Sequence, residues 1–181
     1  AESANRNIVQ RQARGGQLAR MRSTLVLAAF DLEQDCMVWA HSGDSRAYLF
    51  RDRMIAARTS DHSLVQQMVR GGMLDEEQAR RHPQRSVLLS ALGSDDGSVV
   101  VDVSDPLRLQ PGDLVLLCSD GVWEPLGDAR LSELVQDSGS PTQLSQRIGA
   151  EIAALADPDQ DNYTVLLVRV DEEDEQTRFL E

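Results

Sequence analysis

Four aspartates stand where apolar segments of the chain stop, and they are Asp44, Asp61, Asp120 and Asp161. An ionised carboxylate at the tip of an apolar strand is costly unless water, a hydrogen bond or a cation meets it. Carboxylates that converge at one sheet edge also repel one another unless a metal ion neutralises them. For any single aspartate, a side-chain turn to the backbone is the commoner role. For Asp44, Asp120 and Asp161 together, the sequence favours a site for Mg²⁺ or Mn²⁺, which prefer oxygen ligands.

The segment LVLLCSDGVW is the strongest single signal, because five apolar residues lead directly into Ser-Asp-Gly. We expect Asp120 to project from the end of a rigid strand, and Gly121 to let the chain turn sharply there. Asp161 and Asn162 are the mirror case, since they precede the apolar run YTVLLV. Each signal alone is weak.

A calcium-binding loop is the first alternative, because Asp157, Asp159 and Asp161 have its alternate spacing. Such a loop needs glycine at its sixth position and an acid at its twelfth. Asn162 and Val168 occupy those positions, so the calcium loop is rejected.

Other catalytic classes have little support in the sequence. The three histidines, His41, His62 and His82, are far apart, and a lone histidine is more often structural. His62 is expected to be a capping or loop residue. No Gly-x-Ser-x-Gly elbow, phosphate-binding loop or paired-cysteine zinc spacing is present.

The elements that must position these acids follow from apolar periodicity. Seven strands are predicted, at 23–31, 35–42, 47–50, 54–57, 98–103, 114–119 and 163–170. Helical spacing and caps predict two consecutive helices in the first half of the segment 61–93, and further helices at 131–136 and 143–156. Strands that come in runs with helical blocks between them indicate an α+β fold with mainly antiparallel sheets. We expect one domain over 1–170 and an acidic tail over 171–181.

Composition limits the possible partners. The chain has 181 residues and a net charge of −12, which argues against non-specific binding to nucleic acid or anionic lipid. No apolar run is long enough for a membrane span, and no signal peptide is visible. Cys36 and Cys118 lie in apolar runs and are interpreted as thiols of a cytoplasmic protein.

Taken in order, several segments resemble the PPM family (type 2C) of metal-dependent serine/threonine protein phosphatases in its bacterial form. These segments span about residues 18–170, and they are STLV, GDSRAYLFRD, TSDHSLVQQMVRGGMLDEEQARRHPQRSVLLSALG, LQPGDLVLLCSDGVWEPL and DQDNYTVLLVRV. The resemblance implies two packed, mainly antiparallel sheets with helices outside, an α-β-β-α sandwich here without its N-terminal strands. It also implies hydrolysis of phosphoserine and phosphothreonine on proteins by a metal-activated water.

The resemblance assigns roles to particular residues. Asp120 and Asp161 match ligands of a two-ion Mn²⁺ or Mg²⁺ centre, and Asp44 matches the acid that helps to hold a third ion. Their neighbours are expected to support them, and these are Ser45, Ser119, Gly121 and Asn162. The segment 61–93 matches a flap beside the active site that contacts substrate protein, with Asp61, His62 and Ser63 at its start.

Two motifs of the family are not in this sequence. These are an Asn-Glu-Asp segment and an Asp-Gly-x-Gly-Gly-His motif, which carry further metal ligands and the presumed general acid. We therefore expect the 181 residues to be an incomplete or weakly active form. A catalytically inactive regulatory or binding module is the alternative. The expected partners are phosphoprotein substrates of a cognate kinase, with no nucleic acid and no membrane span.

Overall fold

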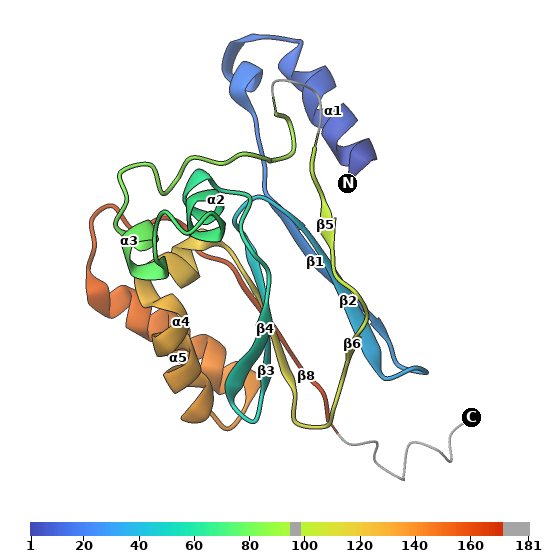
Figure 1. The fold of residues 1–181 in the computed structure, drawn as a ribbon, viewed down its shortest axis with the longest axis vertical. Helices are drawn as coiled ribbons and strands as arrows, with labels where there is room; N and C mark the ends of the chain where they lie inside the picture. Colours follow the sequence, from blue (N-terminus) through green and yellow to red (C-terminus); the bar gives the residue numbers. More distant parts are fainter. Residues whose placement is uncertain (95–98, 172–181) are drawn as a thin grey trace.

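Two four-stranded antiparallel sheets form the body of the computed structural model, which describes residues 1–94 and 99–171 (Figure 1). The first sheet contains β1 (Leu25–Asp31), β2 (Cys36–Ser42), β5 (Asp102–Val103) and β6 (Leu107–Arg108). β2 is its centre and pairs with the other three strands. The second sheet has the order β4 (Met54–Arg58), β3 (Arg46–Arg51), β7 (Leu114–Cys118), β8 (Val165–Arg169). The α+β class with two packed antiparallel sheets is confirmed.

The helices are α1 (Glu2–Gln12), the 3-10 helix η1 (Gly16–Arg20), α2 (Leu64–Arg70), α3 (Glu76–Arg80), α4 (Asp120–Gln136) and α5 (Pro141–Leu155). In Figure 1, α4 and α5 cover the outer face of the second sheet, and α1 lies beyond the end of the first sheet. None of the helices in the described residues is long and apolar enough to cross a membrane.

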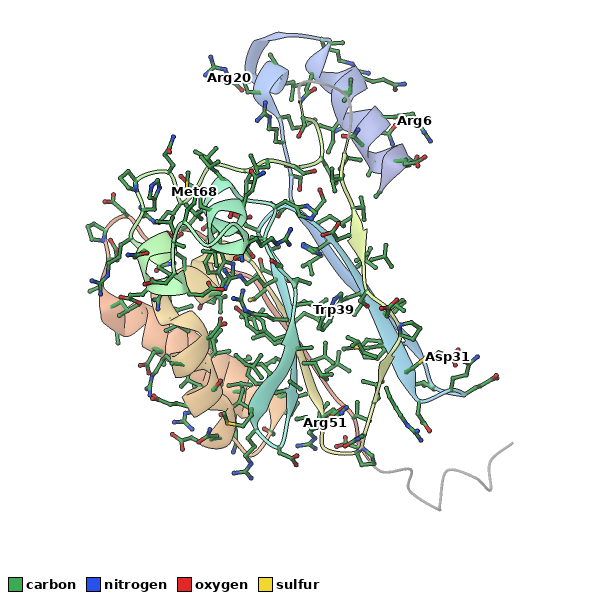
Figure 2. All side chains as sticks on the ribbon, in the orientation of Figure 1. Arg6, Arg20, Asp31, Trp39, Arg51 and Met68 are labelled. Carbon is green, nitrogen blue, oxygen red and sulfur yellow. The ribbon has the colours of Figure 1, made fainter. Side chains whose placement is uncertain are left out.

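The central strands of the second sheet, β3 and β7, are buried on both faces, which explains why they are continuous apolar runs. On β3, Tyr48 and Phe50 face the core shared with α4 and α5. Ala47 and Leu49 alternate with them and face the first sheet. Figure 2 shows Trp39 of β2 in that space between the sheets, where it is 6% exposed.

Two predicted elements differ from the structure. The helix predicted at 131–136 begins at Asp120 instead, and Pro125 and Gly127 lie inside it. Gly127 has φ 72, and the helix kinks there. Because proline and glycine usually end a helix, the sequence of this segment resembles a turn. The strand predicted at 98–103 is paired only at Asp102–Val103; residue 98, like most of the predicted acidic tail (172–181), lies outside the described residues.

The segment 61–93 contains α2 and α3 and then crosses the molecule without regular structure. Asp75 caps α3 with a complete capping box, and Ser63 caps α2 through its hydroxyl. Isolated bridges join Ser63 to Leu88 and Ser23 to Leu92. Figure 1 shows α2 and α3 outside the sheets, next to the start of α4.

Helix α5 should stabilise the fold through its buried face. Ile148 is fully buried against the second sheet, and Ile148→Ala should lower the free energy of unfolding by about 2–5 kcal/mol because it leaves a cavity. Leu155 is 50% exposed on the same helix, and Leu155→Ala should cost about 0.5 kcal/mol or less. Urea titration of both variants checks this, and equal losses would contradict the packing.

Candidate metal centre beside the flap

Strand pairing brings Asp44 and Asp120 to one edge of the second sheet. Asp44 lies in the tight turn between β2 and β3, two residues before Arg46. Asp120 lies two residues after Cys118, and Arg46 pairs with Cys118 across β3 and β7. Both aspartates line one pocket, so the register of these two strands decides that they share a site.

Asp161 reaches the same edge from the neighbouring strand. Cys118 pairs with Val165 across β7 and β8, and Asp161 precedes Val165 by four residues. The backbone there is in close contact with the start of α4, because a Cβ added to Gly121 would meet the Asn162 carbonyl oxygen at 2.5 Å. Residue 121 must therefore be glycine because the Asn162 backbone lies so close to it, and not because the chain turns sharply there, as the sequence had predicted.

The carboxylates at this edge influence one another electrostatically. Burial raises the pKa of Asp44 to about 6, with smaller contributions from the nearby carboxylates of Asp120 and Asp61. The pKa of Asp120 is also raised, mainly by burial, while the Gly121 N–H opposes this and Asp161 and Glu124 add to it. A cation at this edge would relieve the repulsion, and the all-oxygen donor set fits Mn²⁺ or Mg²⁺.

Neighbouring residues fix the orientation of these acids. The Gly121 N–H donates to Asp120 Oδ1 at 2.9 Å, and the Asn162 N–H donates to Asp161 Oδ1 at 2.7 Å. Ser119 accepts a hydrogen bond from the Thr164 N–H at 3.0 Å, which joins the two strands at the site. The other predicted supporting residue, Ser45, shares a hydrogen bond of 2.8 Å with the Thr24 hydroxyl.

A buried ion pair that the sequence analysis missed lies directly behind the acids. Arg46 donates two hydrogen bonds of 2.8 Å to the carboxylate of Asp61, and both side chains are more than nine-tenths buried. Its guanidinium also lies 3.4 Å from the centre of the Trp123 ring. The Trp123 indole N–H in turn donates to the Asp44 backbone oxygen at 2.8 Å. This chain of contacts connects the start of the flap with the turn that carries Asp44.

The three residues predicted at the start of the flap are buried. Asp61, His62 and Ser63 are 5%, 8% and 3% exposed. Asp61 holds Arg46 and contributes to the pocket wall, while Ser63 caps α2. Placed in this way, they anchor the flap to the sheets.

Basic side chains of the flap face the acids. Arg80 and Arg85 line the pocket that contains Asp44 and Asp120. They also line the adjoining hollow that contains Asp161. Positive and negative groups therefore meet across one opening, an arrangement suited to an anionic ligand together with a cation.

The Arg46–Asp61 pair should be costly to break. Asp61→Ala leaves the buried guanidinium with the neutral Tyr48 hydroxyl and with Asp128, which is 3.5 Å away and partly exposed. The free energy of unfolding should therefore fall by about 3–5 kcal/mol. Glu76→Ala removes an exposed partner of Arg58 and should cost about 1 kcal/mol or less. Similar losses in the two variants, measured by urea titration, would contradict a buried anchor.

Asp44 should make the metal-free protein less stable as pH rises. Because its folded pKa is about 6, above the ordinary 3.8, the folded state binds the proton more tightly than the unfolded state. Stability is therefore lost between about pH 4 and pH 6, by up to about 3 kcal/mol. Asp44→Asn should reduce this slope in unfolding measured with chelator, and an unchanged slope would show that Asp44 does not titrate in this way.

The comparisons with known proteins agree on one family. The chain is 36% identical over 171 residues to the serine/threonine phosphatase stp of Listeria monocytogenes, a match that covers 94% of this chain and 65% of that protein. The chain thus spans just under two thirds of the length of that curated relative. No protein-family model matches.

Solved structures give the same answer. The PPM Ser-Thr phosphatase MsPP from Mycobacterium smegmatis, in complex with cacodylate, has a TM-score of 0.77 at 30% identity, over 93% of this chain and 70% of that one. The catalytic domain of the phosphatase PstP, in complex with two manganese ions, has a TM-score of 0.75 at 26% identity, over 94% and 68%. The chain belongs to the PPM family of metal-dependent serine/threonine protein phosphatases.

Proposed function

We propose that this chain is part of an enzyme that hydrolyses phosphoserine and phosphothreonine on proteins. The observation that carries the proposal is the meeting of Asp44, Asp120 and Asp161, from three separate segments, at one sheet edge beside basic flap residues. The family relationship supports the same reaction, and the curated relative is named a serine/threonine phosphatase.

The three aspartates would hold Mn²⁺ or Mg²⁺. Asp120 and Asp161 would contribute to a two-ion centre, and Asp44 would help to hold a third ion. Manganese is supported by the two ions in the PstP structure. Such ions, when bound, lower the pKa of a water and neutralise charge on the phosphoryl oxygens. The chain itself orients the ligands, because backbone N–H groups fix one oxygen of Asp120 and one of Asp161. The other oxygen of each carboxylate is left for a cation.

The flap would bind the phosphate-bearing segment of the substrate. Arg80 and Arg85 border both hollows at the acidic edge, and guanidinium groups suit phosphate oxygens. A phosphoprotein made by an opposing serine/threonine kinase is therefore the proposed partner. Cys36 and Cys118 are free thiols, which fits the cytoplasm.

The 181 residues by themselves should turn over slowly. The Asn-Glu-Asp and Asp-Gly-x-Gly-Gly-His motifs of the family are not among them. The ligand atoms of Asp44, Asp120 and Asp161 are also too far apart for these residues to surround one ion by themselves. In the described part of the chain, only His41, His62 and Asp102 have ligand atoms that close together. We infer that the complete centre takes further ligands from those motifs. A catalytically inactive module remains the competing function.

Activity measurements can separate these functions. The experiment compares phosphopeptide hydrolysis at increasing Mn²⁺ by the 181-residue chain and by a fusion that places the motif-bearing segment of the Listeria phosphatase before it. We expect turnover by the fusion, its abolition by chelator, and a loss of about a hundredfold or more in Asp120→Asn, which removes one anionic ligand.

Asp159→Asn is the matched control, because it removes an equal charge from the loop beside Asp161 and should leave the rate nearly unchanged. Rapid turnover by the short chain would contradict the expected incompleteness. A fusion that binds Mn²⁺ but hydrolyses no phosphopeptide at any Mn²⁺ concentration would support the inactive module.

A further inference from the structure

A second group of ligating side chains lies apart from the acidic edge. His41 comes from β2, Asp102 from β5 and His62 from the start of the flap. His41 and Asp102 are directly opposite each other in the β2–β5 pairing, so their side chains lie on the same face. One ligand atom from each of the three residues lies within 4.8 Å of the others. In the described residues, this is the one group of three or more such side chains close enough to share an ion.

His41 is prepared to act as a ligand. Its Nε2 lies 3.0 Å from the Ser60 backbone oxygen, which can only accept, so Nε2 carries the proton. Nδ1 then has a free lone pair, and it is buried without a hydrogen-bond partner. Burial lowers the pKa of His41, which keeps the imidazole neutral. A histidine that donates one ring N–H to a carbonyl and directs the other nitrogen elsewhere is the usual arrangement at metal sites.

His62 supplies the second buried ring nitrogen, which lies beside Asp102. Its Nε2 is buried 3.0 Å from Asp102 Oδ2, although the angles of this contact are poor for a hydrogen bond. The proximity of His62 lowers the pKa of Asp102. The two imidazole rings lie 4.6 Å apart at an angle of 31°. A buried ring nitrogen without a partner, next to a second one whose contact with the carboxylate is poorly aligned, is costly unless something binds there.

We propose that His41, His62 and Asp102 bind one divalent transition-metal ion of the zinc type, at a site separate from the oxygen-ligated acidic edge. Imidazole nitrogen suits Zn²⁺ and its neighbours in the first transition row, whereas Mg²⁺ and Mn²⁺ favour carboxylates. Tetrahedral zinc at 2.0–2.1 Å from its ligands requires ligand atoms about 3.3 Å apart. The His62–Asp102 contact already has nearly this length. Two histidines and one carboxylate leave a fourth position for water.

Binding an ion would require only small shifts of Asp102 and His62. Asp102 is half exposed at the end of a two-residue strand, so its carboxylate can shift by about an ångström. Binding through His62 Nε2 moves the ring proton to Nδ1, which now receives the Gly43 N–H at 3.4 Å. That contact is long, and opening it costs little.

The ion would hold the flap in place. His62 also donates its backbone N–H to the Gly43 oxygen at 2.9 Å, and Gly43 precedes Asp44. An ion on His62 would thus tie the start of the flap to β2, β5 and the turn that carries Asp44. The nearby charges that act on the group are Asp61 on His41 and Arg70 on Asp102. The experiment must distinguish a bound metal ion from a metal-free His62–Asp102 contact.

Cobalt titration provides the test, since Co²⁺ replaces Zn²⁺ and its visible absorption reports histidine ligation. The 181-residue chain is titrated in excess Mg²⁺, which fills the carboxylate edge and competes poorly for imidazole. We expect one equivalent of Co²⁺ to give visible bands in the wild type and in Asp44→Asn. His41→Gln and His62→Gln should weaken binding by about tenfold or more, while His82→Gln, an unclustered histidine, should not.

A second measurement avoids dependence on the buried variants. Asp102→Asn changes a half-exposed group, and in it the rise in Tm produced by Zn²⁺ should be much smaller than in the wild type. The proposal is overturned if wild-type protein gives no bands, or if the bands survive His41→Gln and disappear in Asp44→Asn. Because no readout is enzymatic, these outcomes are independent of the phosphatase proposal.

Discussion

The buried pair of Arg46 and Asp61 is the interaction on which the site depends. The Arg46 side chain extends from β3 and is 8% exposed, so its charge must be balanced locally. Asp61 supplies that balance from the first residue of the flap, and Trp123 covers the guanidinium from α4. Three elements that are distant in sequence are therefore fixed relative to one another by one cation. The turn that carries Asp44 is attached to the same group through Trp123.

The acidic edge is the opposite electrostatic case. There, partial burial and mutual repulsion raise the pKa values of Asp44 and Asp120, and no cationic side chain forms an ion pair with either among the described residues. Such an arrangement destabilises the folded protein unless a cation binds, which is typical of a functional site. Arg46 lies close enough to lower the pKa of Asp44, but its charge is largely committed to Asp61. The fold thus uses the buried Arg46 for anchoring and leaves these acids without a cationic partner among the described residues.

The sequence predicted the sheets well because β3 and β7 are buried on both faces, and continuous apolar runs report that directly. It also singled out Asp44, Asp120 and Asp161 as candidate ligands, since acids at strand ends are a local signal. The early start of α4 was missed because Pro125 and Gly127 resemble breakers, although the helix passes through them with a kink. The need for Gly121 was assigned to a turn, because its contact with Asn162 depends on strand register and cannot be seen locally.

Pairings across long sequence separations were the least predictable part. His41 and His62 were each interpreted as isolated structural histidines, since nothing within a few residues of either indicates the other. The β2–β5 register and the return of the flap bring them together with Asp102.

The fold gathers two kinds of donor atoms at two places in one small domain. Strand ends gather carboxylate oxygens at an open edge, a donor set that suits hard cations, while two imidazole rings lie buried between the first sheet and the flap. Because the two donor sets share the turn from His41 to Asp44, an ion at the nitrogen site would position the turn without competing for the carboxylates.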